Sequence, residues 1–236
     1  MYRVRVIACG VFVLVAQPAL AFNQLDGQDC LHQHDNDLRI EACTRILDEA
    51  NEPANVRAAA LVSRGEAYTY KRDYQKALAD YEQGIKLDPK NWEGFNGRGV
   101  VLAQTGHSER AIADYTTASR LNPRHPLPRI NLCEEYIVLD RLSAAVEHCT
   151  KSIELQTSPI ALRLRGTAYL KMGKFAPAIA DFDAALKQSP KYAAALYGRA
   201  MAKQKSGDQA GASADMTAAK ALDAEVAKGF EKYKLN

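Results

Sequence analysis

The sequence has almost no excess of charge of either sign. Its 31 lysine and arginine residues are nearly balanced by 28 aspartate and glutamate residues, which leaves a formal net charge of +3 at pH 7. Binding to nucleic acid or to an anionic membrane surface is driven by a strong basic excess. The composition therefore gives no support for either kind of partner, and we expect the chain not to bind nucleic acid.

The motifs of common catalytic and cofactor sites are also lacking. The sequence contains no H-E-x-x-H, no G-x-S-x-G nucleophile elbow and no phosphate-binding loop. It also has neither the C-x-x-C-H of haem attachment nor a redox C-x-x-C. We therefore expect a protein that is not an enzyme and that carries no cofactor.

One segment leaves open a metal-binding or enzymatic alternative. Cys30, His32 and His34 lie close together, and Cys30 and His34 have the i, i+4 spacing that would place two zinc ligands on one helix face. No second cluster completes a tetrahedral set, and Cys30 has a competing use in a disulfide. Metal binding is therefore the less favoured interpretation, and we expect no metal site.

Long apolar runs are absent, with one exception at the start of the chain. Residues 6–15 are almost entirely apolar, follow Arg3 and Arg5, and precede a small-residue cleavage signature, A-L-A, that ends at Ala21. This layout is typical of a secretory signal peptide. We therefore expect residues 1–21 to be removed from the mature protein.

Two other interpretations of this first segment are disfavoured. A membrane anchor needs about 20 apolar residues, and this run is shorter. A lipoprotein signal does not fit because Cys9 stands before most of the apolar run. We expect an exported protein, periplasmic or secreted, with no integral membrane segment after cleavage. Cleavage removes two arginines and no acidic residue, which lowers the formal net charge from +3 to +1.

What the sequence does have is a period of 33 or 34 residues. A small residue recurs at steps of 34, 34, 33 and 34 residues, at Gly65, Gly99, Cys133, Gly166 and Ala200. A second series follows it by 16 residues each time, at Tyr81, Tyr115, Cys149, Phe182 and Met216. Such self-similarity indicates one supersecondary unit copied in tandem.

Each unit has the pattern of two helices. In residues 58–91, one apolar stripe with helical spacing runs through Gly65, a second runs through Tyr81, and Pro89 ends the unit because proline cannot continue a helix interior. The small residue allows the second helix to approach closely, and the tyrosine ring fills the remaining space. Neither helix can bury its stripe alone, so neighbouring units must stack.

These residues resemble the tetratricopeptide repeat family. The segment Leu61-x-x-Arg64-Gly65-x-x-Tyr68, the later Ala77-x-x-x-Tyr81 and Pro89 fit the pattern W-x-x-L-G-x-x-Y…A-x-x-x-F…P, with leucine in place of tryptophan. The resemblance implies an all-α fold, a right-handed α-solenoid of helix–turn–helix repeats. It covers five repeats, namely 58–91, 92–125, 126–158, 159–192 and 193–226.

The third repeat departs most from the pattern, and its cysteines suggest why. Four cysteines remain after removal of the signal, an even number that suggests disulfides in an oxidising compartment and allows three pairings. Cys133 occupies the small position of its repeat and Cys149 the aromatic position, and these two positions face each other. We therefore expect a Cys133–Cys149 disulfide that contributes about 3 kcal/mol.

The ends of the array are expected to be capped. Residues 40–45 resemble residues 146–151, which puts Cys43 at an aromatic position and predicts a disulfide with Cys30. Residues 22–57 would then form an N-terminal capping helical pair, a truncated repeat. At the other end, residues 227–236 are predicted to form a short capping helix, because a solenoid needs a polar-faced cap. Its apolar face would include Phe230 and Tyr233 and would cover the last repeat.

Charged residues also follow the period. In four repeats an arginine precedes the small position and an aspartate precedes the aromatic position. In the third repeat both are lost together, to Leu132 and His148. This joint loss favours structural ion pairs between the two helices over a ligand-binding ladder of arginines. The expected pairs are Arg64–Asp80, Arg98–Asp114, Arg165–Asp181 and Arg199–Asp215.

The resemblance implies a non-catalytic adaptor that binds a peptide or partner protein in a concave groove lined by first helices. The residues expected to line that groove are Glu66, Asn96, Gln104, Glu134, Arg163, Thr167, Lys171, Tyr197 and Lys205. The lysine and asparagine set with which chaperone-tail binders clamp a terminal carboxylate is missing. Arg163, Lys171 and Tyr197 are expected to contribute most, because arginine and tyrosine dominate binding hot spots. The alternative is a structural or assembly subunit of an envelope complex that binds through its convex face or its ends.

Overall fold

The computed structural model describes residues 27–31 and 34–235, so the expected signal segment 1–21 lies outside the described residues. Every regular element in the described part of the chain is a helix. A short helical segment at residues 27–31 precedes the longer helices. These are α2 (Asn36–Asp48), α3 (Ala54–Tyr70), α4 (Tyr74–Leu87), α5 (Trp92–Gln104), α6 (Ser108–Leu121), α7 (Leu127–Val138), α8 (Leu142–Leu155), α9 (Pro159–Lys171), α10 (Phe175–Gln188), α11 (Ala193–Ser206), α12 (Gln209–Leu222) and α13 (Lys228–Glu231).

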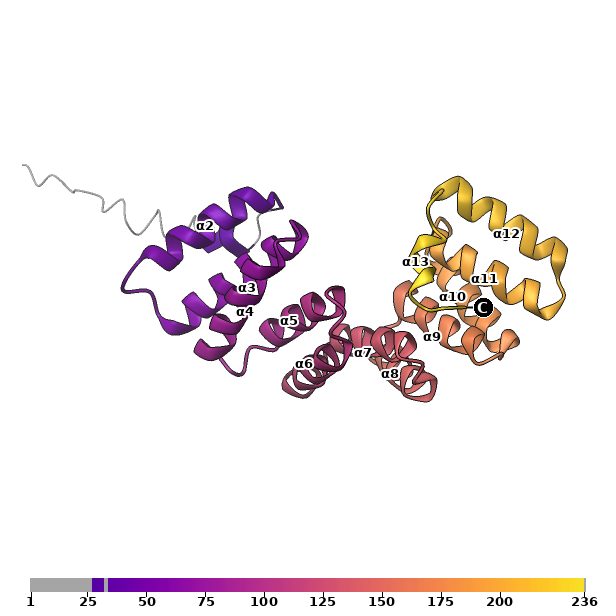
Figure 1. Cartoon of the computed structure of the whole chain (residues 1–236), viewed down its shortest axis with the longest axis horizontal. Coiled ribbons are helices and arrows are strands. Elements are labelled where there is room, and N and C mark those ends of the chain that lie inside the picture. Colours follow the sequence, from indigo (N-terminus) through magenta and orange to yellow (C-terminus); the bar gives the residue numbers. More distant parts are fainter. Residues whose placement is uncertain (1–26, 32–33, 236) are drawn as a thin grey trace, which may run out of the picture.

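The helices form consecutive pairs that stack into an arch, as Figure 1 shows. Each first helix packs on the second helix of its own repeat and also contacts the first helix of the next repeat, from α3 through α5, α7 and α9 to α11. These first helices form a continuous inner row, whereas α6 and α8 lie on the outer side of the bend. The predicted all-α solenoid is confirmed.

The turn inside each repeat uses a left-handed backbone conformation. Gly106, Gly173 and Gly207 have φ values of +81°, +72° and +98°, and they occupy the same register position in the second, fourth and fifth repeats. Arg72 and Asp140 hold that position in the other two repeats, with φ values of +60° and +61°. Glycine adopts this conformation without steric cost, and it therefore predominates there. The conserved turn geometry keeps the two helices of every repeat antiparallel.

In the first and fourth repeats, the aromatic residue of the second helix is held between two glycines. The Tyr81 ring lies so close to Gly65 that an added Cβ would be 3.1 Å from it, which agrees with the expected small–large contact. A Cβ on Gly97, in the next repeat, would lie only 2.4 Å from the same ring. Phe182 has the same relation to Gly198, at 2.5 Å. The ring therefore joins one repeat to the next as well as the two helices of its own repeat.

The four expected arginine–aspartate pairs all form with the same geometry. Each arginine donates one hydrogen bond to each carboxylate oxygen of its aspartate, with donor–acceptor distances of 2.6 to 2.8 Å. The aspartates are buried, with 6 to 7% of their surface exposed. Two parallel bonds satisfy both oxygens of the carboxylate, which makes its burial tolerable.

The arginines also reach the preceding repeat. Arg165 donates a third hydrogen bond to the hydroxyl of Thr150 on α8, at 3.2 Å, and Arg199 donates to Asp183 on α10, at 2.6 Å. Arg64 similarly donates to Thr44 on α2, at 3.0 Å. Each of these three arginines therefore ties together three helices. This tie extends the pairing beyond the single repeat in which it was predicted.

Two disulfides join the cysteines in the expected pairing. Cys30 is bonded to Cys43 and Cys133 to Cys149, with 2.11 Å between the sulfur atoms of each pair, and all four residues are fully buried. The second disulfide links α7 to α8 at the positions where other repeats place a small residue against a ring. A covalent bond there replaces the packing contact that the third repeat lacks.

We predict that the Arg165–Asp181 pair is energetically coupled. Replacing Arg165 with leucine should lower the free energy of unfolding by about 3 kcal/mol, because it leaves the buried Asp181 carboxylate without its partner. The double replacement Arg165→Leu with Asp181→Leu should cost less than the single one. Urea unfolding of the four proteins measures the coupling.

The exposed pair Glu147–Lys151 offers a matched control for that cycle, because both side chains are about half exposed. Its coupling should remain below about 1 kcal/mol. Additive effects at Arg165 and Asp181 would show that the buried pair does not interact.

We also predict that the Cys133–Cys149 disulfide stabilises the third repeat. Its loop spans 16 residues, so replacing both cysteines with alanine should lower the free energy of unfolding by about 3 kcal/mol. Peptide mapping without reduction should recover Cys133 linked to Cys149 and Cys30 linked to Cys43. A peptide that links either N-terminal cysteine to Cys133 or Cys149 would contradict the pairing.

Candidate functional site

The inner face of the arch has two halves that differ in accessibility. Over the N-terminal half lies a hollow of about 1040 Å³ between α3, α5 and the start of α7. We call it the open groove, and its lining includes Glu66, Tyr70, Trp92, Asn96, Val100, Gln104 and Asn131. Over the C-terminal half, the inner face is covered by residues 226–235, which we call the tail.

Two asparagines lie side by side in the open groove. The amide nitrogen of Asn131 on α7 donates a hydrogen bond to the amide oxygen of Asn96 on α5, at 2.9 Å. Within the described residues, the nitrogen of Asn96 and the oxygen of Asn131 form no further hydrogen bond. The pair therefore leaves an amide nitrogen that can donate and an amide oxygen that can accept, the two kinds of group that a peptide unit needs.

Aromatic and apolar side chains flank this polar pair. Tyr70, at the end of α3, is 66% exposed, and Leu127, at the start of α7, is 39% exposed. Trp92 begins α5 and packs its ring against His125, with 4.4 Å between the ring centroids. The exposed ring of Tyr70 and the partly buried ring of Trp92, both at helix ends, are suited to contact the side chains of a ligand.

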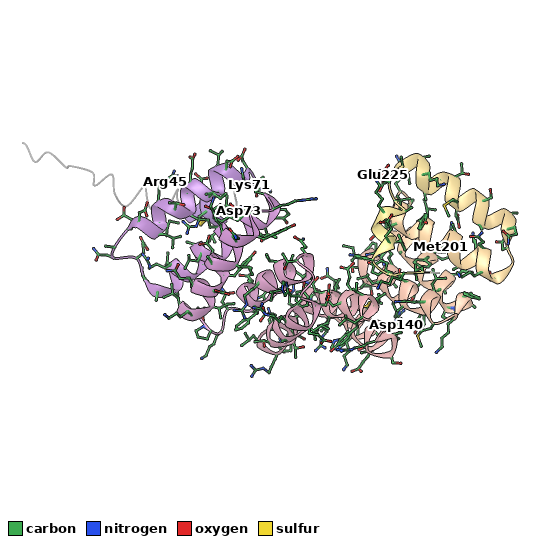
Figure 2. The ribbon with its side chains drawn as sticks, in the orientation of Figure 1. Arg45, Lys71, Asp73, Asp140, Met201 and Glu225 are labelled. Carbon is green, nitrogen blue, oxygen red and sulfur yellow. A yellow bond between two sulfur atoms is a disulfide. The ribbon has the colours of Figure 1, made fainter. Side chains whose placement is uncertain are left out.

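The charges around the open groove are mixed and largely in solvent. Glu66 is about half exposed and accepts a hydrogen bond from Arg39 on α2, at 3.2 Å. Glu93 and Arg72 also line the hollow. Figure 2 shows Lys71 and Asp73 at the turn after α3, on the N-terminal rim of the arch, and Glu225 on the opposite rim. These screened charges favour no strongly charged ligand.

The tail closes the C-terminal half through a few side chains. Phe230 packs on Tyr197 of α11, with 4.9 Å between the ring centroids. The hydroxyl of Tyr233 donates a hydrogen bond to Glu134 on α7, at 2.5 Å, and Lys232 approaches the same carboxylate oxygen at 2.8 Å. Figure 1 shows α13 on the inner side of α11.

The pKa shifts of Glu134 and Tyr233 favour the protonation states that their hydrogen bond needs. Burial alone would raise the pKa of Glu134, but the Lys232 ammonium and the hydrogen bonds from Lys232 and Tyr233 lower it below its usual value. Burial, followed by the nearby Glu134 carboxylate, raises the pKa of Tyr233. The carboxylate therefore stays ionised and the hydroxyl stays protonated, which are the states that the hydrogen bond requires.

The nine residues expected to line the groove fall into three groups, namely those in the open groove, those that the tail contacts and those near the covered half. Glu66, Asn96 and Gln104 line the open groove. Glu134, Arg163 and Tyr197 lie on the inner face as expected, but the tail contacts all three.

The remaining three expected residues lie near the covered half. Thr167 is fully buried and bonds the backbone oxygen of Arg163 at 2.9 Å. Lys171 donates to the Ile137 backbone oxygen at 3.1 Å and pairs with Asp140 at 2.9 Å. Lys205 lines a smaller hollow of about 310 Å³ beside the end of the tail.

These contacts correct two expectations. Arg163, Lys171 and Tyr197, expected to be the strongest ligand contacts, are bound to other parts of the same chain and are not free in this structure. The C-terminal segment also covers more than the last repeat. Val226 does pack there, but Phe230 and Tyr233 join the buried cluster around α7 and α9. The amphipathic pattern of the tail identified which of its faces is buried, but it did not identify the helices against which that face packs.

Several residues of the open groove were missed by the sequence interpretation. Tyr70 occupies the same register position as Gln104 and Lys171, so the period alone would have found it. Asn131 lies one residue out of register with Asn96, and only the stacking of α5 on α7 brings their amides together. Trp92 stands at the start of a helix, outside the apolar stripes.

The Cys30, His32 and His34 segment does not offer the ligands proposed for a metal. Cys30 is bonded to Cys43, so its thiolate is not available, and His32 lies outside the described residues. Among residues 27–31 and 34–235, no group of three histidine, cysteine or acidic side chains is arranged to hold a metal ion. No helix in the same part of the chain is long and apolar enough to span a membrane.

Comparison with known sequences relates the repeats to a family. The tetratricopeptide repeat profile matches residues 58–91 and 159–192. The DnaJ protein P58IPK homolog B of Oryza sativa subsp. japonica is 29% identical over 149 residues, which cover 56% of this chain and 32% of that protein. Dynein axonemal assembly factor 4 of Rattus norvegicus is 31% identical over 115 residues, covering 45% and 27%. The chain thus spans about a third or less of the length of these relatives.

Solved structures share the fold at low sequence identity. A tetratricopeptide repeat protein from Parabacteroides merdae superposes with a TM-score of 0.69, at 20% identity, over 93% of this chain and 91% of its own. YrrB, described as having an unusual peptide-binding site, superposes with a TM-score of 0.61, at 20% identity, over 82% and 99%. MamA superposes with a TM-score of 0.60, at 22% identity, over 72% and 94%. The two profile matches, together with the period and the helix pairs, show that the chain carries tetratricopeptide repeats, and the solved structures share its fold.

Proposed function

We propose that this protein is a non-catalytic adaptor that binds an extended peptide segment of a partner protein in the open groove. The observation that carries the proposal is the Asn96–Asn131 pair, which leaves an amide nitrogen and an amide oxygen unbonded in a hollow that aromatic and apolar side chains also line. A peptide backbone in extended conformation offers the matching groups. Hydrogen bonds to the backbone would supply affinity for many sequences, and side-chain contacts would supply the selection.

The walls of the groove indicate which side chains the ligand would carry. Tyr70 and Trp92 line the hollow and suit apolar or aromatic side chains of a ligand. Glu66 and Arg72 carry opposite charges at the rim, so a ligand with a large net charge of either sign would gain little there. We expect a mixed apolar and polar segment. YrrB, which has a similar fold, is described as having a peptide-binding site, and this likeness supports the same use here.

We also propose that the adaptor acts outside the cytoplasm, in the periplasm or as a secreted protein. Two features support this location: the signal-like segment that ends at Ala21, and the two buried disulfides. Disulfides persist in oxidising compartments and are rare where thiols are kept reduced. Cell fractionation with thiol labelling before and after reduction tests the location.

We predict that a groove variant loses peptide binding without losing its fold. Peptides selected from a random display library against the full chain would serve as the probe. The triple variant Tyr70→Ala, Gln104→Ala, Asn131→Ala should bind them at least tenfold more weakly, about 1.4 kcal/mol. Fluorescence anisotropy measures the affinity, and the helical circular-dichroism spectrum and melting temperature should remain nearly unchanged, since Tyr70 and Gln104 are exposed.

A matched triple variant on second helices provides the control. Lys86, Arg120 and Lys187 are exposed and lie on α4, α6 and α10. Their replacement by alanine should leave peptide affinity unchanged. If the selected peptides bind the groove variant as tightly as the parent protein, or if only the control variant loses them, the open groove is not the binding site.

A further inference from the structure

The tail is attached to the repeats in the way a bound ligand is attached. Its helix, Lys228–Glu231, is a single turn, too short to be stable alone. The backbone hydrogen bonds of Lys228, Phe230, Tyr233 and Lys234 all run to other residues of the tail or of the turn before it. Among the described residues, every hydrogen bond between the tail and the inner face of the repeats is made by side chains.

The surface beneath the tail contains charges that a plain cap does not need. Arg163 donates hydrogen bonds to the hydroxyls of Tyr192, at 2.8 Å, and Tyr233, at 3.4 Å, but it forms no ion pair within the described residues. The four arginines of the repeat ladder each have an aspartate instead. Glu134 receives Lys232 and Tyr233. Burying such charges costs free energy, which apolar residues would avoid. The charges of Arg163 and Glu134 therefore determine which side chains can bind to the surface beneath the tail.

The open groove provides an internal comparison. The same inner row of first helices continues from α7 through α5 to α3, and there no segment of the described chain covers it. The repeats can therefore stack with their inner face exposed. The covering of α7, α9 and α11 by the tail is consequently not a requirement of the solenoid.

We propose that the inner face of α7, α9 and α11 is a second peptide-binding surface, and that the tail is the intramolecular ligand that keeps it closed. Its ligand is a segment of another protein with the pattern aromatic–x–lysine–aromatic, as in Phe230-Glu231-Lys232-Tyr233. The first aromatic ring of the ligand packs on Tyr197, where Phe230 packs when the tail is bound. The lysine and the hydroxyl of the second ring bind Glu134, and that hydroxyl also accepts a hydrogen bond from Arg163.

Because the tail is part of the same chain, a free ligand must compete with a tethered one for this surface. A short tether holds the tail near its surface at an effective concentration in the millimolar range, so a free segment with the same contacts binds only when the tail opens. Chain termini are the segments that most readily open locally. The second surface is therefore closed by default and becomes available on release of the tail. It is separate from the open groove and does not depend on the function proposed for that groove.

The test uses the full chain and a fluorescent synthetic peptide with the sequence of residues 224–236. The variant Phe230→Ala, Tyr233→Ala removes both anchors of the tail and should bind this peptide at least tenfold more tightly than the parent chain. The open-groove triple variant, made in the same background, should not change that affinity. Equal binding by the parent and the tail variant, or no binding by a folded tail variant, would overturn the proposal.

A charge exchange tests whether the peptide occupies the surface of the tail. In the tail-variant background, Glu134→Lys should weaken binding of the original peptide, and a peptide carrying Lys232→Glu should recover it. The same modified peptide should bind poorly when Glu134 is intact, because like charges would then meet. If affinity is indifferent to both exchanges, the peptide binds elsewhere and the proposal fails.

Hydrogen exchange on the unaltered chain covers the case in which the tail variant does not fold. The amides of Phe230 and Tyr233 should exchange faster than those of α9, and an excess of the peptide should accelerate them further by displacing the tail. If these amides exchange only together with α9 and α11, the tail is a fixed part of the fold and not a displaceable ligand.

Discussion

The packing of an aromatic ring of the second helix against a glycine of the first is the contact on which the array depends, and in the first and fourth repeats the ring also meets a glycine of the next repeat. Tyr81 lies against Gly65 of its own repeat and Gly97 of the next, and the space at Gly97 admits no side chain at all. This contact fixes the distance between the helices of a repeat and also the distance between repeats. The third repeat keeps the spacing by different means, with the Cys133–Cys149 disulfide. Interiors packed this closely transmit such a spacing along the whole chain.

The arginine ladder adds specificity to that packing. Each arginine meets a buried aspartate with two hydrogen bonds, and three of them also reach a polar side chain of the preceding repeat. A buried ion pair contributes little net stability, but a misplaced repeat would leave a buried carboxylate unpaired. The ladder therefore penalises wrong registers of stacking. Its single gap, at Leu132 and His148, coincides with the disulfide, where a covalent bond sets the register directly.

The two halves of the inner face have different chemistry on the same scaffold. Over α3 and α5 the face is open and presents an asparagine pair beside aromatic side chains. Over α9 and α11 the face carries Arg163 and Tyr197, and the tail binds both. Repeats share their buried contacts and differ at the inner positions, because only the buried contacts are constrained by stacking. One solenoid thus presents two inner surfaces of different chemistry.

The sequence by itself determined the solenoid, the arginine–aspartate pairs and the pairing of cysteines. These features follow from contacts within one repeat, about 16 residues apart, where the period gives the register directly. Only the tertiary structure decided which part of the inner face is accessible. The bond between Tyr233 and Glu134 joins residues 99 positions apart, and the asparagine pair depends on how one repeat rotates on the next. No local pattern encodes such contacts, because they depend on the curvature that all repeats produce together.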